Sequence, residues 1–293
     1  MKKYKIADIV IDLDCVQNLI HQNLKTFEWK EQEEAQLYWS VHGSDSPVIP
    51  NSVSWTELAG FCVGRFEDKV YVSYPLEDIY LIRWIVYEDN FSKATFYFKS
   101  GSLHNLSKER SDELIEYLFA FCREAFFLGA LYMDGISIHS ASLIYKGKGI
   151  VFSARSQTGK STHTNRWKER FGTPILDGDV TVCRCLEDGI FVYGLPWSGT
   201  SGLFLNEKVE LEALVFLKQG PRNIVSTMKI YEAFQQLFSR SFTPLWDSLL
   251  AQQRMKLTEA IIKRIPQIYL MECLPDSEAV DVIKKEIDVN WKS

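Results

Sequence analysis

The sequence predicts an α+β fold, in which a β-rich N-terminal region over residues 1–105 precedes a second domain over residues 106–293. Short runs of β-branched and aromatic residues fill the first region, as is typical of strands. The second region combines apolar runs with helical periodicity. Its middle contains a predicted strand, then a loop, then a helix that begins at Gly159-Lys160-Ser161. The 293 residues suffice for one large or two modest domains with a buried core.

Composition excludes several classes of protein. With 33 Lys and Arg against 38 Asp and Glu, the net charge is −5, so we expect no nucleic-acid partner. None of the six cysteines forms a Cys-x-x-Cys pair, which gives no support for a zinc site and indicates thiols in a reduced compartment. The sequence leaves open whether the chain forms a homo-oligomer.

We expect no membrane segment and a cytoplasmic location. The N-terminus has lysines but lacks the apolar stretch of a signal peptide. The most apolar segment, residues 114–131, carries Glu116, Arg123 and Glu124, so it is predicted to be a buried helix.

The N-terminal region contains four predicted strands, at residues 5–12, 70–74, 79–87 and 94–98. A cluster of turn-forming residues at 42–47 lies between two of them. The many tyrosines and tryptophans fit the core and faces of an antiparallel sheet better than a recognition surface.

The second region begins with a helix predicted from Ser111, as N-cap, to Leu131. A helix over 161–170 follows the Gly159-Lys160-Ser161 turn and is ended by Gly172. Towards the C-terminus, one helix is predicted around 230–238 and another starts at Thr243-Pro244 and ends before Pro266. The predicted strands are 136–144 and 149–153, which form a hairpin, then 174–177, 180–186, 190–194, 211–217 and 267–272, and a last helix begins at Asp276 or Ser277.

The loop before the predicted helix 161–170 is a candidate phosphate-binding site. A strand leads in and a helix leads out, so backbone N–H groups and the Lys160 ammonium converge on one point. Ala154 stands where the strict phosphate-loop pattern has its first glycine. The alternative is an ordinary helix N-terminus capped by Thr158 or Ser156. The predicted nucleotide-binding residues are Ser156, Gln157, Thr158, Gly159, Lys160, Ser161 and Thr162.

An acidic residue downstream completes this site. We expect Lys160 to reach the β- and γ-phosphates of ATP, and the Ser161 hydroxyl to ligate Mg²⁺. Asp179 follows a short predicted strand and would hold the same metal directly or through water. The predicted cofactors are therefore ATP and Mg²⁺.

The chain resembles the HPr kinase/phosphorylase-related kinases, which belong to the fold group of phosphoenolpyruvate carboxykinase. A bacterial subfamily of these kinases shares the succession Gly-Lys-Ser-Thr-His-Thr, Gly-Asp and Pro-Trp-Ser-Gly. The resemblance covers residues 136–218 and implies a P-loop core of this kinase type behind the β-rich region. It is carried by residues 138–140, 153–162, 176–179 and 193–199.

The resemblance implies catalytic roles for His139, Asp177 and Asp179. HPr kinases carry two adjacent aspartates, a base and a metal carboxylate, and here Gly178 fills the first position and Asp179 the second. Asp177 is then the candidate base, and His139 a residue near the reacting phosphate. A purely structural role for His139, as a lone histidine on a strand, is the alternative. Ala154 and Gln157 also replace glycines of the better-known members.

The predicted acceptor site is the loop after residue 193, with Trp197, Ser198 and Gly199 as substrate-binding residues. The alternative for Trp197 is loop packing. We expect a neutral hydroxyl acceptor there, since the sequence has no basic stripe. Lys218 and Arg222 follow a predicted strand and either neutralise phosphates or form a solvated basic turn.

Together these features predict an ATP-dependent kinase that transfers the γ-phosphoryl group to a hydroxyl of a small molecule or of a serine in a peptide or carrier protein. A non-catalytic nucleotide- or peptide-binding module is the alternative, favoured by Gly178 and Ala154. A carboxykinase or phosphorylase is a weaker alternative, because the required set of metal ligands is not visible.

Overall fold

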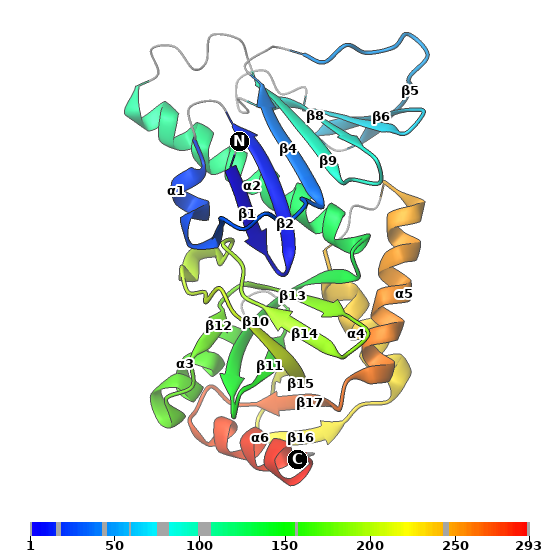
Figure 1. Cartoon of the computed structure of the whole chain (residues 1–293). Coiled ribbons are helices and arrows are strands. Elements are labelled where there is room, and N and C mark those ends of the chain that lie inside the picture. Colours follow the sequence, from blue (N-terminus) through cyan, green and yellow to red (C-terminus); the bar gives the residue numbers. More distant parts are fainter. Residues whose placement is uncertain are drawn as a thin grey trace. The chain divides into compact units, whose positions relative to one another are not determined.

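A computed structural model describes residues 2–15, 19–42, 46–58, 60–74, 82–98, 107–155, 158–242 and 246–291. It shows a mixed α+β protein with two large sheets (Figure 1). The chain divides into two compact units, Met1–Tyr132 and Met133–Ser293. The helix that the sequence grouped with residues 106–293 therefore packs with the N-terminal unit, and the boundary lies after this helix.

The first unit is built on a nine-stranded sheet in the order β3-β1-β2-β4-β9-β8-β7-β6-β5. Most neighbouring strands pair antiparallel, as expected, but β4 pairs in parallel with both β2 and β9. The strands are β1 Lys2–Ile6, β2 Ile9–Cys15, β3 Glu28–Trp29, β4 Leu37–His42, β5 Ser54–Leu58, β6 Phe61–Phe66, β7 Lys69–Ser73, β8 Ile82–Glu88 and β9 Lys93–Phe98, and the short helices are α1 His21–Leu24 and η2 Lys25–Phe27.

The sequence predicted a single strand over residues 5–12, but the structure has a hairpin there. Ile6 on β1 pairs with Ile9 on β2. Ala7 and Asp8 form the turn with φ of 50° and 60°, the backbone of a type I′ turn, without the glycine that would announce one. The turn was missed because Asp8, which tolerates positive φ, is not followed by the glycine of a usual Asp-Gly turn and Ala7 rarely adopts this conformation.

Helix α2, Lys108–Leu131, packs on this sheet. Its N-cap is Ser107, whose side chain accepts a hydrogen bond from the Arg110 N–H, so the helix starts before the predicted Ser111. Near its end Gly129 passes close to β4, where an added Cβ would lie 2.6 Å from Leu37 Cδ2. The apolar segment 114–131 is thus the buried face of a globular helix, and no helix among the described residues is long and apolar enough to cross a bilayer.

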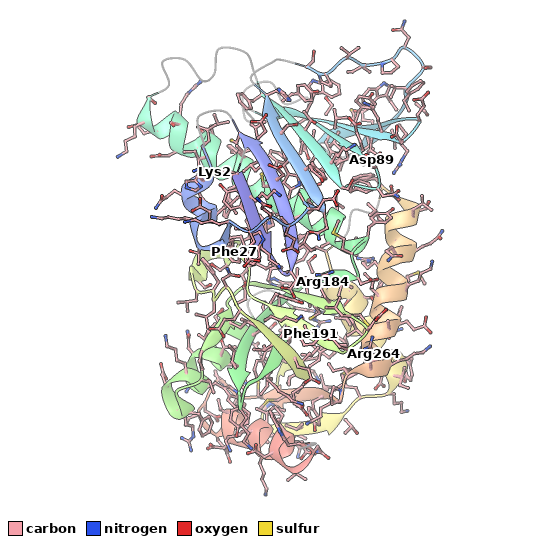
Figure 2. All side chains as sticks on the ribbon, viewed as in Figure 1. Lys2, Phe27, Asp89, Arg184, Phe191 and Arg264 are labelled. Atoms are coloured by element: carbon pink, nitrogen blue, oxygen red, sulfur yellow. The ribbon has the colours of Figure 1, made fainter. Side chains whose placement is uncertain are left out.

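The second unit contains an eight-stranded sheet in the order β11-β10-β13-β14-β15-β17-β16, with β12 paired to β10. The strands are β10 Gly135–Tyr145, β11 Lys148–Ser153, β12 Ile175–Asp177, β13 Val180–Cys185, β14 Ile190–Tyr193, β15 Lys208–Gln219, β16 Ile224–Thr227 and β17 Gln267–Cys273, and the helices are α3 Lys160–Phe171, η3 Gly199–Ser201, α4 Ile230–Arg240, α5 Ser248–Arg264 and α6 Glu278–Val289. The predicted hairpins β10–β11 and β13–β14 are confirmed, the latter pairing Arg184 with Phe191 (Figure 2).

The hydrogen-bonded strands of this unit close on themselves. Besides its neighbour β10, β11 pairs in parallel with β15, so β10, β13, β14, β15 and β11 form a ring. Gly149 on β11 makes room for this closure, since a Cβ there would lie 2.3 Å from Val192 Cγ2 on β14. The ring holds the end of β11, and hence the loop after it, between two strands.

Helices pack on both faces of β15. Val215 and Leu217 join the buried cluster that contains Trp167 of α3 and Ile283 of α6. Phe216 points to the other face, where the Arg240 guanidinium of α4 lies 5.4 Å from its ring centre. Helix α5 begins at Ser248 with Asp247 as N-cap, later than predicted, and Thr243 and Pro244 lie outside the described residues.

Candidate functional site

The candidate phosphate loop joins β11 to α3. Gly159 is the N-cap of α3 with φ of 107°, a left-handed conformation that other residues adopt only with strain. Its carbonyl accepts the first helical bond, from the His163 N–H at 2.9 Å. The N–H groups of the first turn remain free to bind an anion, and the helix dipole favours negative charge there. Helix α3 thus begins directly after Gly159, at the position that the sequence predicted.

Five of the seven predicted nucleotide-binding residues, 158–162, lie in the part of the chain that the structure describes. Lys160 is the first residue of α3 and is 8% exposed, while the Ser161 and Thr162 side chains beside it are exposed. Thr158 and Gly159 lie at the helix start. Ser156 and Gln157 lie outside the described residues.

Three of the predicted residues meet beside this helix start. Lys160 Nζ lies 2.7 Å from His139 Nε2, and His139 Nδ1 lies 3.7 Å from Asp179 Oδ1. An ammonium only donates, so Nε2 accepts and the ring proton sits on Nδ1, facing the carboxylate. Burial and the Lys160 charge lower the pKa of His139, with Asp179 opposing them, so the imidazole is neutral at pH 7.

The strands position these three groups. β10 places His139 opposite Val180 of β13, and the Ser140 N–H donates to the Asp179 carbonyl at 3.0 Å. Burial also lowers the pKa of Lys160, against the attraction of Asp179. One carboxylate, one neutral imidazole and one ammonium therefore sit in series at the mouth of the loop.

Asp177 has a different environment. Its carboxylate is fully buried; Oδ1 accepts from the Asp179 and Val180 N–H groups at 3.0 and 3.1 Å, and Oδ2 from the Leu195 N–H at 2.9 Å. Burial raises the pKa of Asp177 to about 7, against the pull of these donors. A pKa near 7 suits a general base, but the buried side chain is directed into the turn and holds its backbone.

The loop after β14 packs directly onto this turn. A Cβ on Gly178 would lie 2.1 Å from Ser201 Oγ, and one on Gly199 would lie 2.5 Å from Asp179 Oδ2. Ser201 Oγ donates to the Ser198 carbonyl at 2.6 Å, which fixes the hydroxyl in that place. Ser201 thus fills the space that an aspartate at position 178 would need.

The predicted acceptor residues are mostly covered. Trp197 and Ser198 are 3% and 4% exposed, and neither lines the two cavities described below. Gly199 is exposed and adjoins the Asp179 carboxylate. The alternative of loop packing accounts for the burial of Trp197, whereas Gly199 adjoins the Asp179 carboxylate.

The residues fit a magnesium ion held jointly with a nucleotide. Mg²⁺ is usually bound through one or two carboxylates, with waters and substrate phosphates completing its shell. Asp179, whose side chain is 34% exposed, and the exposed Ser161 hydroxyl supply such oxygens. Among the described residues no group of three His, Cys, Asp or Glu converges, so a metal held by the protein alone has no site there.

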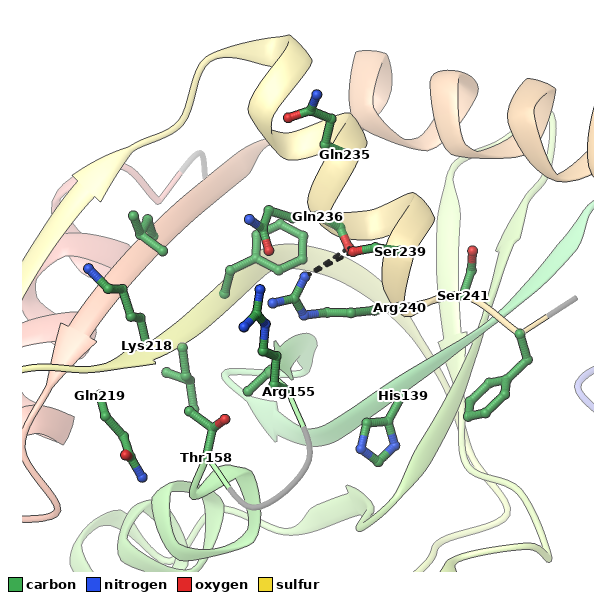
Figure 3. A pocket seen from close by; sticks show the side chains of 15 residues that line it. His139, Arg155, Thr158, Lys218, Gln219, Gln235, Gln236, Ser239, Arg240 and Ser241 are labelled. Atoms are coloured by element: carbon green, nitrogen blue, oxygen red, sulfur yellow. Dashed lines mark hydrogen bonds between the residues drawn. The ribbon is translucent and has the colours of Figure 1, made fainter.

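Two cavities meet at the loop, and Thr158 lines both. The larger, of about 1290 Å³, includes His139, Arg155, Lys218 and Arg240 in its lining (Figure 3). The smaller, of about 430 Å³, is lined by α3 residues including His163 and by the segment 273–276 before α6.

Sequence reasoning missed two arginines of the larger cavity, Arg155 and Arg240. Burial, followed by repulsion from Arg155, lowers the pKa of Arg240. Arg240 ends α4, where a basic residue is ordinary, and its sequence position carries no signal for the site. Lys218 lines the same cavity, but its Nζ is paired with Glu272 at 2.9 Å, and Arg222 is exposed.

No protein-family model matches the chain, and no curated protein matches its sequence. Among solved structures, the Hpr(Ser) kinase/phosphatase from Coxiella burnetii aligns with 12% identity and a TM-score of 0.25, over 41% of this chain and 92% of that one. So low a TM-score establishes no common fold.

We predict that His163 makes stability depend on pH. It is buried, accepts from Trp167 Nε1 at 3.3 Å, and burial lowers its pKa from 6.5 to about 4. As the pH falls, His163 is protonated in the unfolded chain before it is protonated in the folded protein. Its contribution to the free energy of unfolding is therefore complete above pH 6.5 and is lost as the pH falls to 4. The loss should be on the order of 3 kcal/mol, measured by urea unfolding.

His163→Gln should flatten this dependence, because its amide oxygen can accept the Trp167 bond but does not titrate. His42→Gln, in the first unit, should keep the wild-type slope. Equal slopes for wild type and His163→Gln would contradict the assignment.

We predict that Gly178→Asp destabilises the protein instead of restoring a catalytic pair of aspartates. The new side chain would displace Ser201, at a cost typical of overpacking, about 1–3 kcal/mol. Ser201→Gly should recover part of this loss in the double variant, as a double-mutant cycle would measure. Additive effects of the two changes would show that the contact does not matter.

Proposed function

We propose that the second unit is an ATP-dependent kinase that phosphorylates a hydroxyl. The observation that carries this proposal is the placement of Lys160, at the free N-terminus of α3, within 2.7 Å of His139, which in turn faces Asp179. A cation, a helix start and a carboxylate are the groups that hold a nucleotide triphosphate with its Mg²⁺.

The two cavities suggest separate donor and acceptor sides. In phosphoryl transfer the entering and leaving oxygens lie in line on opposite sides of the phosphorus. The smaller cavity follows the α3 flank, away from His139, and its volume of about 430 Å³ lies in the range of ordinary ligand pockets. It is proposed to take the base and ribose, and the larger cavity, which His139 lines, the acceptor.

Bound Mg²⁺ would neutralise the β- and γ-phosphates, and Asp179 with Ser161 would hold it. Lys160 would turn from His139 to the phosphates, which leaves the neutral Nε2 free to take the acceptor's hydroxyl proton. The acceptor oxygen then bonds to the γ-phosphorus as the bond to the β,γ-bridging oxygen breaks, and ADP leaves with that electron pair. We assign Asp177 to shaping the turn, because its oxygens bind backbone N–H groups.

A second candidate is a nucleotide-binding module without catalysis. Ser201 fills the space beside Gly178 where the resembling kinases carry a base, which favours this alternative. The two candidates differ in turnover: a kinase transfers radiolabelled γ-phosphate to an acceptor or slowly to water, whereas a binding module leaves ATP intact.

We expect Lys160→Met to weaken binding of a non-hydrolysable ATP analogue at least tenfold, about 1.4 kcal/mol or more, because the loop loses its buried ammonium. Calorimetry with Mg²⁺ present measures this. Lys168→Met is the matched control, since Lys168 lies exposed in the last turn of the same helix. Equal affinity of wild type and Lys160→Met would remove the basis of the proposal.

We expect Asp179→Asn to lower Mg²⁺-dependent γ-phosphate release at least a hundredfold, because the metal loses its carboxylate. Asp177→Asn should instead lower stability by about 1–3 kcal/mol, since its NH₂ group cannot accept the Leu195 bond, and should keep measurable turnover. A fully folded but inactive Asp177→Asn protein would return the base role to Asp177.

A further inference from the structure

The charged side chains that line the larger cavity are all positive. Among the described residues, 15 line this cavity; Arg155, Lys218 and Arg240 are cationic, and none of the 15 is an aspartate or glutamate. Lys218 is neutralised by Glu272, outside the lining. The two arginines are therefore the unbalanced charges of a cavity in a chain whose net charge is −5.

Arg155 and Arg240 both line this cavity. Figure 3 shows both side chains there, and the charge of Arg155 lowers the pKa of Arg240. Two like charges held together raise the energy of the empty site, and an anion between them would lower it.

Arg240 also keeps unused donor capacity. Its Nη1 donates to the Gln236 carbonyl at 3.1 Å and to Ser239 Oγ at 3.2 Å, which fixes the guanidinium on its own helix. Its Nε is buried and has no hydrogen-bond partner among the described residues. A buried donor without an acceptor is costly, and it leaves the hydrogen-bonding capacity of this guanidinium incomplete.

The cavity is larger than a nucleoside or a phosphate requires. Its volume of about 1290 Å³ exceeds the usual range for small-ligand pockets. Around the arginines its wall presents the amides of Gln235 and Gln236 and the hydroxyl of Ser239, which are neutral hydrogen-bonding groups. Such a wall fits a polar molecule that carries charge at one point.

We propose that the acceptor carries, in addition to its reacting hydroxyl, a second anionic group, a carboxylate or a phosphate, which Arg240 and Arg155 bind. This inference rests on the proposed kinase function. It replaces the neutral acceptor that the sequence suggested, because the charge of this cavity comes from residues that are far apart along the chain.

The position of Arg240 indicates that the anionic group belongs to the acceptor and not to the nucleotide. Arg240 comes from α4 and lies over Phe216, on the cavity side of β15, whereas the proposed phosphate site is formed by the α3 start and Lys160. His139 lines the same cavity as Arg240 and contacts Lys160, and both cations lower its pKa. An acceptor anchored at Arg240 can thus present its hydroxyl to His139.

Binding of simple anions tests the site. The protein would be saturated with Mg²⁺ and a non-hydrolysable ATP analogue and titrated by calorimetry with inorganic phosphate and with malonate. We expect saturable binding of at least one probe and at least tenfold weaker binding by Arg240→Gln and Arg155→Gln. Arg240→Lys should retain part of the affinity. Arg264→Gln is the matched control, because Arg264 also ends a helix (Figure 2) but donates to Cys185 Sγ of β13 and to the Glu187 carbonyl in the turn after it.

The outcomes separate this inference from the proposed function. If the loaded wild type binds neither probe, or if Arg240→Gln binds them as well as wild type, the anion site is refuted. If Arg240→Gln weakens the ATP analogue as strongly as Lys160→Met does, Arg240 belongs to the donor side: the acceptor assignment is refuted, and the kinase proposal stands. If wild type does not bind the analogue at all, both fall together.

Phosphoryl transfer to matched acceptors identifies the source of the anion. Glycerol would be compared with glycerate and glycerol 3-phosphate, and serine peptides with free C-termini with their amidated forms. We expect labelled phosphate to prefer the charged member of a pair at least tenfold, and Arg240→Gln to abolish the preference. Equal labelling of charged and neutral members would overturn the proposal.

Discussion

The candidate site depends on one buried carboxylate. Asp177 accepts hydrogen bonds from the N–H groups of Asp179, Val180 and Leu195. These bonds fix the turn that exposes the Asp179 side chain, and they tie the turn to the chain that leaves β14. Because a buried carboxylate without donors is strongly unfavourable, this turn and the loop after β14 form together or not at all.

The turn that Asp177 fixes is connected to the phosphate loop through residues of β10. The same turn is bonded to Ser140, next to His139, and His139 contacts Lys160 at the start of α3. Three segments that are separate in sequence are thereby held in one cluster by a short series of contacts. Within this cluster the Lys160 ammonium and the Asp179 carboxylate lie on either side of the His139 ring, so a cationic group and an anionic group are held close to the same imidazole.

Local signals in the sequence predicted the elements that carry the site. Gly172 was expected to end α3, and it is the C-cap with φ of 66°. The hairpins β10–β11 and β13–β14 were predicted from alternating residues and turn residues, and both are present. Lys160 and Asp179 were grouped from the phosphate-loop pattern, and His139 was added by the resemblance; the structure brings the three side chains together.

Non-local contacts explain what the sequence could not predict. Arg240 approaches Arg155 only because α4 packs over β15, and no local pattern encodes that packing. Trp197 lies in a segment rich in glycine and proline, which suggested exposure, yet its side chain is buried. The assignment of α2 to the first unit likewise follows from contacts such as that of Gly129 with Leu37.

The closed ring of strands has a consequence for how the protein is made. β11 ends at Ser153, but its second neighbour, β15, begins only at Lys208. During synthesis the segment that leads into the phosphate loop therefore emerges with one edge unpaired, and it stays so until β15 follows. Parallel pairing across such a separation is slow, because the intervening chain must first be ordered. Folding of the cluster of Lys160, His139 and Asp179 is thus a late event, and chains that terminate before residue 208 would display an open strand edge to their neighbours.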